Sequence, residues 1–175
     1  EDIQTDGPNS RILLSGCTAT NAEHFLRKIK AVFETNALFQ WLFPELIPDS
    51  TGKSGKWTET EICIPRTKNF PESSVETIGV GGRVTGRHYT DIIEDDLVEL
   101  TVANNQDEMD KIIEWHEYAE SLLEVPERDR TTVDGTRYTQ ADLYGYIKEH
   151  DKRYTPYERT AIEHDLPIFP ERFTM

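Results

Sequence analysis

The chain has 175 residues, of which 36% are hydrophobic and 30% charged, and its formal net charge at pH 7 is -14. This composition is that of one globular domain with a real core, and it excludes disorder throughout the chain. The surplus of acids repels nucleic acid and anionic membranes, so a DNA contact needs a local basic patch. No apolar run has membrane-spanning length, and we expect no membrane partner. Cys17 and Cys63 lack metal-ligand spacing and fit a reducing compartment.

The first elements along the chain are a strand and a helix. Residues 11–16 form a compact apolar run after a turn, which is typical of a buried strand. From residue 22 to residue 33, apolar side chains recur every three or four positions, which predicts an amphipathic helix. Its expected cap is Thr20 or Asn21, and Asn36 lies near its expected end.

A short helix and two strands are expected next. Residues 38–43 are dense in aromatic and aliphatic side chains, and we expect a short helix that packs under the sheet. The side chains of residues 58–65 alternate in the pattern of a half-exposed strand, and we expect residues 74–79 to form the neighbouring strand. Gly52-Lys53-Ser54 matches the end of a Walker A motif, but Ile47 stands where the first glycine belongs, so it does not predict a phosphate cradle.

The most informative stretch is the run from Tyr89 to Asp96. It is a short β-type segment that ends in adjacent carboxylates, Asp95 and Asp96, and a glycine-rich segment over residues 79–87 leads into it. A buried strand carries acids safely only at its carboxyl end, where ligands of α/β sheets bind. The pattern is that of a Walker B element, in which the first acid holds Mg²⁺ and the second polarises the attacking water. A solvated acidic turn is the alternative.

The second half predicts a helix, a strand and another helix. Residues 109–123 form an amphipathic pattern that Asn104 or Asn105 caps and that Pro126 ends, with His116 as a hydrogen-bonded packing residue. Residues 131–138 then form a strand that runs into a polar turn.

Thr139 and Asp142 resemble a capping box for a helix over residues 140–149, and the tail from residue 151 shows little periodicity. The order of elements predicts an α/β fold with a partly parallel central sheet flanked by helices. If the strands before Asp96 and Thr136 are parallel neighbours, both loops meet at one rim.

Ten segments, taken in order over nearly the whole chain, resemble the large terminase subunit of tailed bacteriophages. They are Ile12-Leu13-Leu14-Ser15, Asn21 to Arg27, Phe43-Pro44-Glu45-Leu46, Lys56-Trp57, Gly79-Val80-Gly81-Gly82, Thr85-Gly86-Arg87-His88, Ile92 to Val98, Gly135-Thr136-Arg137-Tyr138 with Asp142-Leu143-Tyr144-Gly145, and Phe169-Pro170-Glu171. The resemblance implies an ASCE-like P-loop ATPase that drives double-stranded DNA into a procapsid, joined in the full protein to an RNase H-like nuclease.

The resemblance also implies roles for single residues. Asp95 stands where the Mg²⁺-binding aspartate stands, and Asp96 stands at the position of the water-activating carboxylate, which is often glutamate. Thr136, with Arg137 beside it, is similar to the coupling motif that senses the γ-phosphate of ATP.

Two arginines are candidates for a further role. Arg83 and Arg87 lie in the segment from which related motors extend an arginine to a neighbouring subunit's phosphate, where such a charge accelerates the reaction by several orders of magnitude. Ion pairing with nearby acids is the alternative for both.

A complete P-loop motif is absent from the sequence, as is the strand that precedes it. We therefore expect an internal piece of the motor, with residues 1–150 as a partial ATPase domain and residues 151–175 as a connector toward a nuclease domain. The expected cofactors are Mg²⁺ and ATP. The isolated chain should have little ATPase activity. The resemblance further implies portal protein, small terminase subunit and a homo-oligomeric ring as partners, in the cytoplasm of the infected bacterial host.

Two other functions stay open. Glu94, Asp95, Asp96 and Glu99 could collect two divalent ions for phosphodiester hydrolysis, which needs a further acid from another strand. The chain could also be a non-catalytic domain whose acidic surface binds a basic partner.

Overall fold

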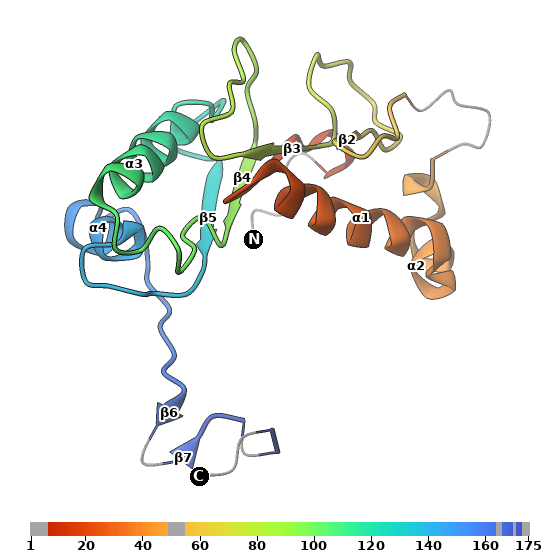
Figure 1. Cartoon of the computed structure of the whole chain (residues 1–175). Coiled ribbons are helices and arrows are strands. Elements are labelled where there is room, and N and C mark those ends of the chain that lie inside the picture. The colour runs from red at the N-terminus through yellow and green to blue at the C-terminus, as the bar shows by residue number, and fades with distance from the viewer. Residues whose placement is uncertain (1–6, 49–54, 164–165, 170, 173–175) are drawn as a thin grey trace.

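The computed structural model describes residues 7–48, 55–163, 166–169 and 171–172, and it shows an α/β architecture (Figure 1). A central sheet of five strands has the order β2-β3-β1-β4-β5. Its strands are β1 (Ile12–Gly16), β2 (Glu61–Ile62), β3 (Val75–Gly79), β4 (Asp91–Asp95) and β5 (Arg130–Asp134). Four of them are parallel, since β1 pairs in parallel with both β3 and β4, and β4 pairs in parallel with β5. The expected partly parallel sheet is therefore confirmed.

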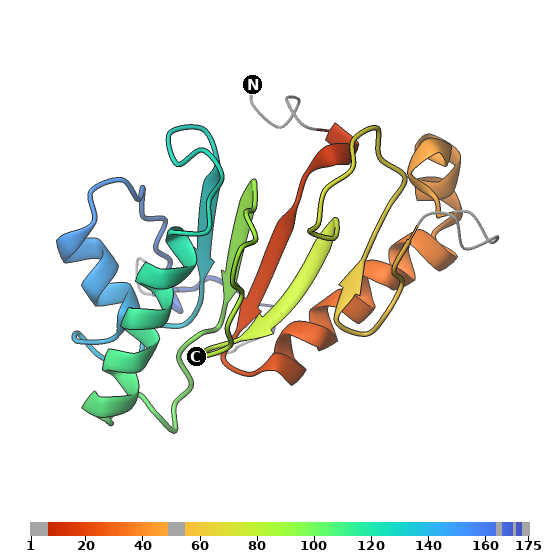
Figure 2. The ribbon, with the colours of Figure 1, turned by 90° about the horizontal axis from the view of Figure 1, so that it is seen from above.

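Helices cover both faces of this sheet (Figure 2). The long helix α1 (Ala19–Thr35) lies on one face, and α3 (Gln106–Glu120) and α4 (Leu143–His150) lie on the other. The remaining elements are α2 (Ala37–Leu42), the 3-10 turns Gly7–Asn9 and Pro44–Leu46, and a small hairpin of β6 (Ile162–Glu163) and β7 (Leu166–Pro167). Figure 1 shows this hairpin well separated from the body of the molecule.

Strand alternation divides the core into two clusters. Leu13 and Ile92 point toward α3 and α4, where they join a large cluster of buried side chains that includes Trp115. Leu14 points toward α1 and packs with Leu26 in a smaller cluster. The same alternation decides which acids of β4 lie on which face.

The helix boundaries follow from side-chain caps, and the predicted caps are partly wrong. The α1 cap is Thr18, whose hydroxyl accepts a hydrogen bond from the Asn21 N–H. Asn105 caps α3, in agreement with the prediction, although α3 ends at Glu120, before the predicted end. In α4 the cap is Asp142, not Thr139, and the helix begins at Leu143.

The position predicted for the short aromatic helix is wrong. It forms, as α2, but it continues beyond α1 at the far end from the sheet's centre and does not pack under the sheet (Figure 1). Trp41 is 76% exposed and Leu38 64% exposed. The dense apolar composition therefore marks an uncovered surface and not a core.

Two further expectations concern the edge strand β2 and the segment that resembles the end of a Walker A motif. Only Glu61 and Ile62 of the predicted strand 58–65 form β2, which pairs antiparallel with β3 as expected of neighbours. Gly52-Lys53-Ser54 lies outside the described residues. Among the residues described, no helix is both long and apolar enough to cross a membrane.

Candidate functional site

The carboxyl ends of the parallel strands form one rim. In the register of the sheet, Gly16 of β1 is opposite Asp95 of β4, and Asp95 is opposite Asp134 of β5. The loops that continue from β4 and β5 therefore begin side by side. One starts with Asp96 and the other with Gly135-Thr136-Arg137, as expected for neighbouring strands.

Asp96 adopts an unusual backbone conformation. Its φ of 47° lies in the left-handed region, and among the described residues it is the one non-glycine residue with positive φ. Its N–H donates a hydrogen bond of 3.0 Å to the carbonyl oxygen of Asp134, which joins the first residue beyond β4 to the last residue of β5. Aspartate tolerates this conformation better than most residues. The side chain of Asp96 is exposed at the rim.

Negative charge accumulates at this rim. Burial raises the pKa of Asp95, and the carboxylates of Asp96 and Asp134 raise it further, while Lys28 of α1 opposes the shift. Asp134 is a member of this group that the sequence pattern did not single out, although it ends β5 as Asp95 ends β4. A divalent cation would relieve the repulsion among the three carboxylates.

The rim fits Mg²⁺ only together with a ligand. Within the part of the chain that the structure describes, no three His, Cys, Asp or Glu side chains form a cluster able to hold a metal by themselves. Mg²⁺ is normally held by one or two carboxylates plus waters and substrate phosphates, and not by a complete protein cage. Asp95 and Asp96 are the two side chains that fit that role.

Thr136 and Arg137 differ in what they can reach. Thr136 is exposed in the turn after β5. The guanidinium of Arg137 donates to the carbonyl oxygens of Thr139 and Gln140, at 3.2 and 3.3 Å, so it holds the loop before α4 in place. In this structure Thr136 is thus the member of the pair that is free to meet a ligand.

The ends of β1 and β4 form a switch point of the sheet. The loop after β1 leads to α1 on one face, whereas the loop after β4 leads toward α3 on the other, and ligands of α/β sheets bind at such a switch point. The Cys17 thiol donates to Glu99 at 2.9 Å across it. Burial and Glu99 raise the pKa of Cys17 to about 11, so this thiol is not a nucleophile at neutral pH.

The two candidate arginines lie on the crossover from β3 to β4. The hydroxyl of Tyr118 holds this crossover by donating to the Val84 carbonyl oxygen at 2.6 Å. Arg83 is exposed, and its guanidinium makes no hydrogen bond or ion pair within the described ranges. Arg87 instead pairs with the buried carboxylate of Glu76, near the amino end of β3. The structure therefore does not bring Arg87 to the rim.

Glu94 lies on the opposite face of β4 from Asp95. Its side chain is fully buried beneath α3, where one oxygen lies 2.7 Å from Nδ1 of His116. His116 is thus a hydrogen-bonded packing residue, as predicted. The expected set of Glu94, Asp95 and Asp96 does not converge on one point, since the alternation of the strand separates its first two members.

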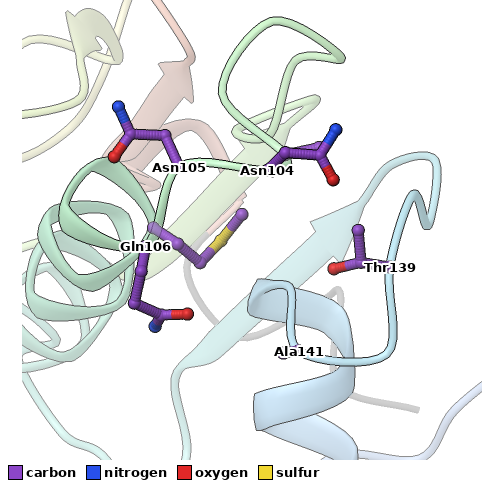
Figure 3. A pocket seen from close by; sticks show the side chains of 7 residues that line it. Asn104, Asn105, Gln106, Thr139 and Ala141 are labelled. Carbon is purple, nitrogen blue, oxygen red and sulfur yellow. The ribbon is translucent and has the colours of Figure 1, made fainter.

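A cavity of about 240 Å³ lies between the loop after β4 and the loop after β5 (Figure 3). In Figure 3, Gln106 at the start of α3 lies on one side and Thr139 on the other. The lining residues are Ala103, Asn104, Asn105, Gln106, Met109, Thr139 and Ala141. Neutral amides dominate its polar surface.

No protein-family model matches this chain, and no curated protein matches it significantly.

Proposed function

We propose that this chain is part of a DNA-packaging ATPase similar to the large terminase subunit of tailed bacteriophages. In this proposal it couples ATP hydrolysis to the movement of double-stranded DNA into a procapsid. The full-length protein would form a homo-oligomeric ring, would contact portal protein and small terminase subunit, and would act in the cytoplasm of the infected bacterium. Residues 1–150 would belong to the motor domain, and residues 151–175 would lead to a nuclease domain.

One observation carries this proposal: the two motif-bearing loops are neighbours. β4 and β5 are adjacent parallel strands, and Asp96 bonds through its backbone to Asp134, two residues before Thr136. Had Asp95 and Thr136 been at opposite ends of the sheet, the proposal would have failed. The position of the rim at a switch point of the sheet supports it further.

The proposed roles follow from this geometry. Mg²⁺, bound together with ATP, would neutralise charge that develops on the phosphates. Asp95 would hold it from its half-buried position, and exposed Asp96 would orient the attacking water. Because Asp96 is shorter than the glutamate often found at this position in the family, it needs a closer water or an intervening one. Thr136 would sense the γ-phosphate, and unpaired Arg83 is better placed than Arg87 to reach a neighbouring subunit.

The open edge of the sheet supports a role as part of a larger motor. In the described part of the chain, no strand pairs with the outer side of β5. We propose that a strand from outside the present chain pairs there and leads into the missing P-loop. This edge is next to Thr136, where a phosphate cradle is required.

The test compares two proteins. The 175-residue chain alone should show little ATPase activity, and the same chain extended by the residues encoded upstream of Glu1 should be active. In the extended protein Asp96→Asn should lower kcat by about 100-fold or more, because it removes a charge that acts on the attacking water. Asp110→Asn, an exposed acid of α3 away from the rim, is the matched control. Strong turnover by the short chain that Asp95→Ala abolishes would contradict the proposal.

The nuclease alternative has one observation in its favour, which is the third rim acid, Asp134. Cleavage of plasmid DNA with Mg²⁺ or Mn²⁺ but without ATP, lost in Asp95→Asn and Asp134→Asn, would favour it over the motor. A non-catalytic domain would instead keep its partner when Asp95 or Asp96 is replaced.

A further inference from the structure

One face of helix α2 packs on the body of the molecule. The centre of the Phe39 ring lies 4.9 Å from that of Phe33 in α1 and 5.3 Å from that of Phe43. The Phe33 ring also lies 5.9 Å from the ring of Trp57, edge to face. The side-chain amide of Gln40 donates to the Phe33 carbonyl oxygen at 2.8 Å. These contacts hold α2 in a fixed orientation at the end of α1 (Figure 1).

The other face of α2 is apolar and exposed. Leu38 and Trp41 are largely exposed, and Leu42 is 50% exposed. Their spacing of three and four residues places them side by side on one side of a helix. Phe43, which follows the helix, is 42% exposed, and we call these four side chains the α2 face. Single exposed apolar side chains are normal, whereas a group of neighbours marks a surface that a partner covers.

The charges that flank the α2 face in the sequence are acidic. In residues 31–48 the charged side chains are Glu34 and Glu45, and none is basic. Glu45 is exposed in the turn after the α2 face, and its carboxylate has no ion pair or hydrogen bond within the described ranges. The preceding cation, Lys30, donates to the Thr58 carbonyl oxygen at 3.0 Å and pairs with Glu59. A partner therefore meets apolar surface beside uncompensated negative charge.

We propose that the α2 face docks an amphipathic helix of a partner protein whose apolar stripe is flanked by lysine or arginine. The apolar stripe covers Leu38 and Trp41, and a basic side chain pairs with Glu45. A second copy of this chain fits less well, because it brings the same acids and a net charge of -14. The same charge repels an anionic membrane. The inference does not depend on nucleotide binding at the rim, so it and the proposed function can fail separately.

The first test titrates the 175-residue chain with two designed helical peptides that share one stripe of leucines. The remaining positions are lysine in one peptide and glutamate in the other. In isothermal titration calorimetry the lysine peptide should bind, and the glutamate peptide should bind about 10-fold or more weakly, because it brings like charges together. Equal binding of the two peptides, or binding of neither, would overturn the proposal.

Substitutions then locate the bound peptide. Trp41→Ala should weaken binding of the lysine peptide about 10-fold or more, because exposed aromatic anchors carry much of the energy of an interface. Leu166→Ala, in the hairpin of β6 and β7, is the matched control and should leave binding unchanged. Glu45→Gln should weaken binding about 3-fold and reduce its dependence on salt, whereas Glu127→Gln, an exposed acid before β5, should not. Undiminished binding in Trp41→Ala would reveal general attraction to the acidic surface and defeat the proposal.

Further measurements examine the other occupants of the α2 face. Light scattering reports self-association of the chain, and sedimentation with phosphatidylcholine vesicles reports membrane binding. We expect neither to show a signal that depends on Trp41. Self-association or vesicle binding that Trp41→Ala abolishes would assign the α2 face to a second copy or to lipid, and the proposal would be wrong. Because Trp41 is exposed, the variant should unfold at the temperature of the parent, so that lost binding reports the lost contact.

Discussion

Gly79, the last residue of β3, has no room for a side chain. A Cβ atom there would lie 2.4 Å from the backbone nitrogen of Ala19 and 2.8 Å from the carbonyl carbon of Thr18. Both atoms belong to the backbone where α1 begins, so neither can move aside as a flexible side chain could. β3 and α1 therefore approach each other as closely as glycine permits.

Gly79→Ala should lower the free energy of unfolding by about 2 kcal/mol through this overlap. Gly81→Ala serves as a comparison, since nothing lies within 4 Å of a Cβ there and the cost comes only from its φ of +79°. We expect about 1 kcal/mol for it. Urea unfolding of both variants measures the difference. Equal losses would mean that the contact between β3 and α1 is looser than the structure shows.

At the scale of residues, the sequence predicts which side chains lie at the end of a strand better than it predicts their backbone conformation and hydrogen bonds. The acid pair at the end of β4 is visible as a change from apolar to acidic residues. The left-handed backbone of Asp96 is not, because it depends on the bond to Asp134 of another strand. Asp134 itself was missed because a single acid before glycine also fits an ordinary turn.

Between elements, the main polar link of β4 with α3 is the pair of Glu94 and His116. Burial by itself lowers the pKa of His116, but the hydrogen bond and charge of Glu94, with the charges of Glu120 and Asp151, outweigh it and leave this pKa raised. Tyr154 completes the surroundings, with its ring 5.8 Å from the imidazole and its hydroxyl on Glu120.

His116→Gln should cost about 3 kcal/mol of unfolding free energy near pH 6, because it leaves the Glu94 charge buried without its partner. The contribution of a raised histidine pKa is complete below the unfolded value of about 6.5 and is lost as pH rises through the folded value. The difference between parent and variant should therefore shrink from pH 6 toward alkaline pH. His150→Gln, at the exposed end of α4, controls for loss of an imidazole. A difference that grows with pH would contradict this assignment.

The elements themselves were largely predictable, because periodicity and caps are local. All four helices and all five strands of the central sheet lie within or beside their predicted ranges. The position of α2 was not predictable, since an apolar run looks the same whether the fold covers it or leaves it exposed. Its exposure depends on where α1 ends relative to the sheet, which is a property of the tertiary structure.

For the whole molecule, the chain after α4 divides into a packed part and a free part. Tyr154 packs against the large cluster and bonds to Glu120 at 2.6 Å. Tyr157, three residues later, is 83% exposed, and the hairpin of β6 and β7 lies away from the body (Figure 1).

A chain that ends after Thr155 should unfold within about 1 kcal/mol of the full chain, since it loses mainly the exposed ion pair of Lys148 with Glu158. A chain that ends after Asp151 also loses Tyr154 and should be about 3 kcal/mol less stable. Guanidinium unfolding of both truncations checks this. If the chain that ends after Thr155 is much less stable than the full chain, the hairpin contributes to the core.

The central strand also constrains how the chain can fold as it leaves the ribosome. β1 ends at Gly16, but its two partners begin only at Val75 and Asp91, so its backbone groups stay unpaired while the residues from β1 to β3 are synthesised. Pairings this distant in sequence form slowly because a long loop must close first. The nascent chain thus exposes an apolar strand from the synthesis of β1 until β3 is complete at Gly79, and chaperones that bind extended apolar segments would find their target in that interval.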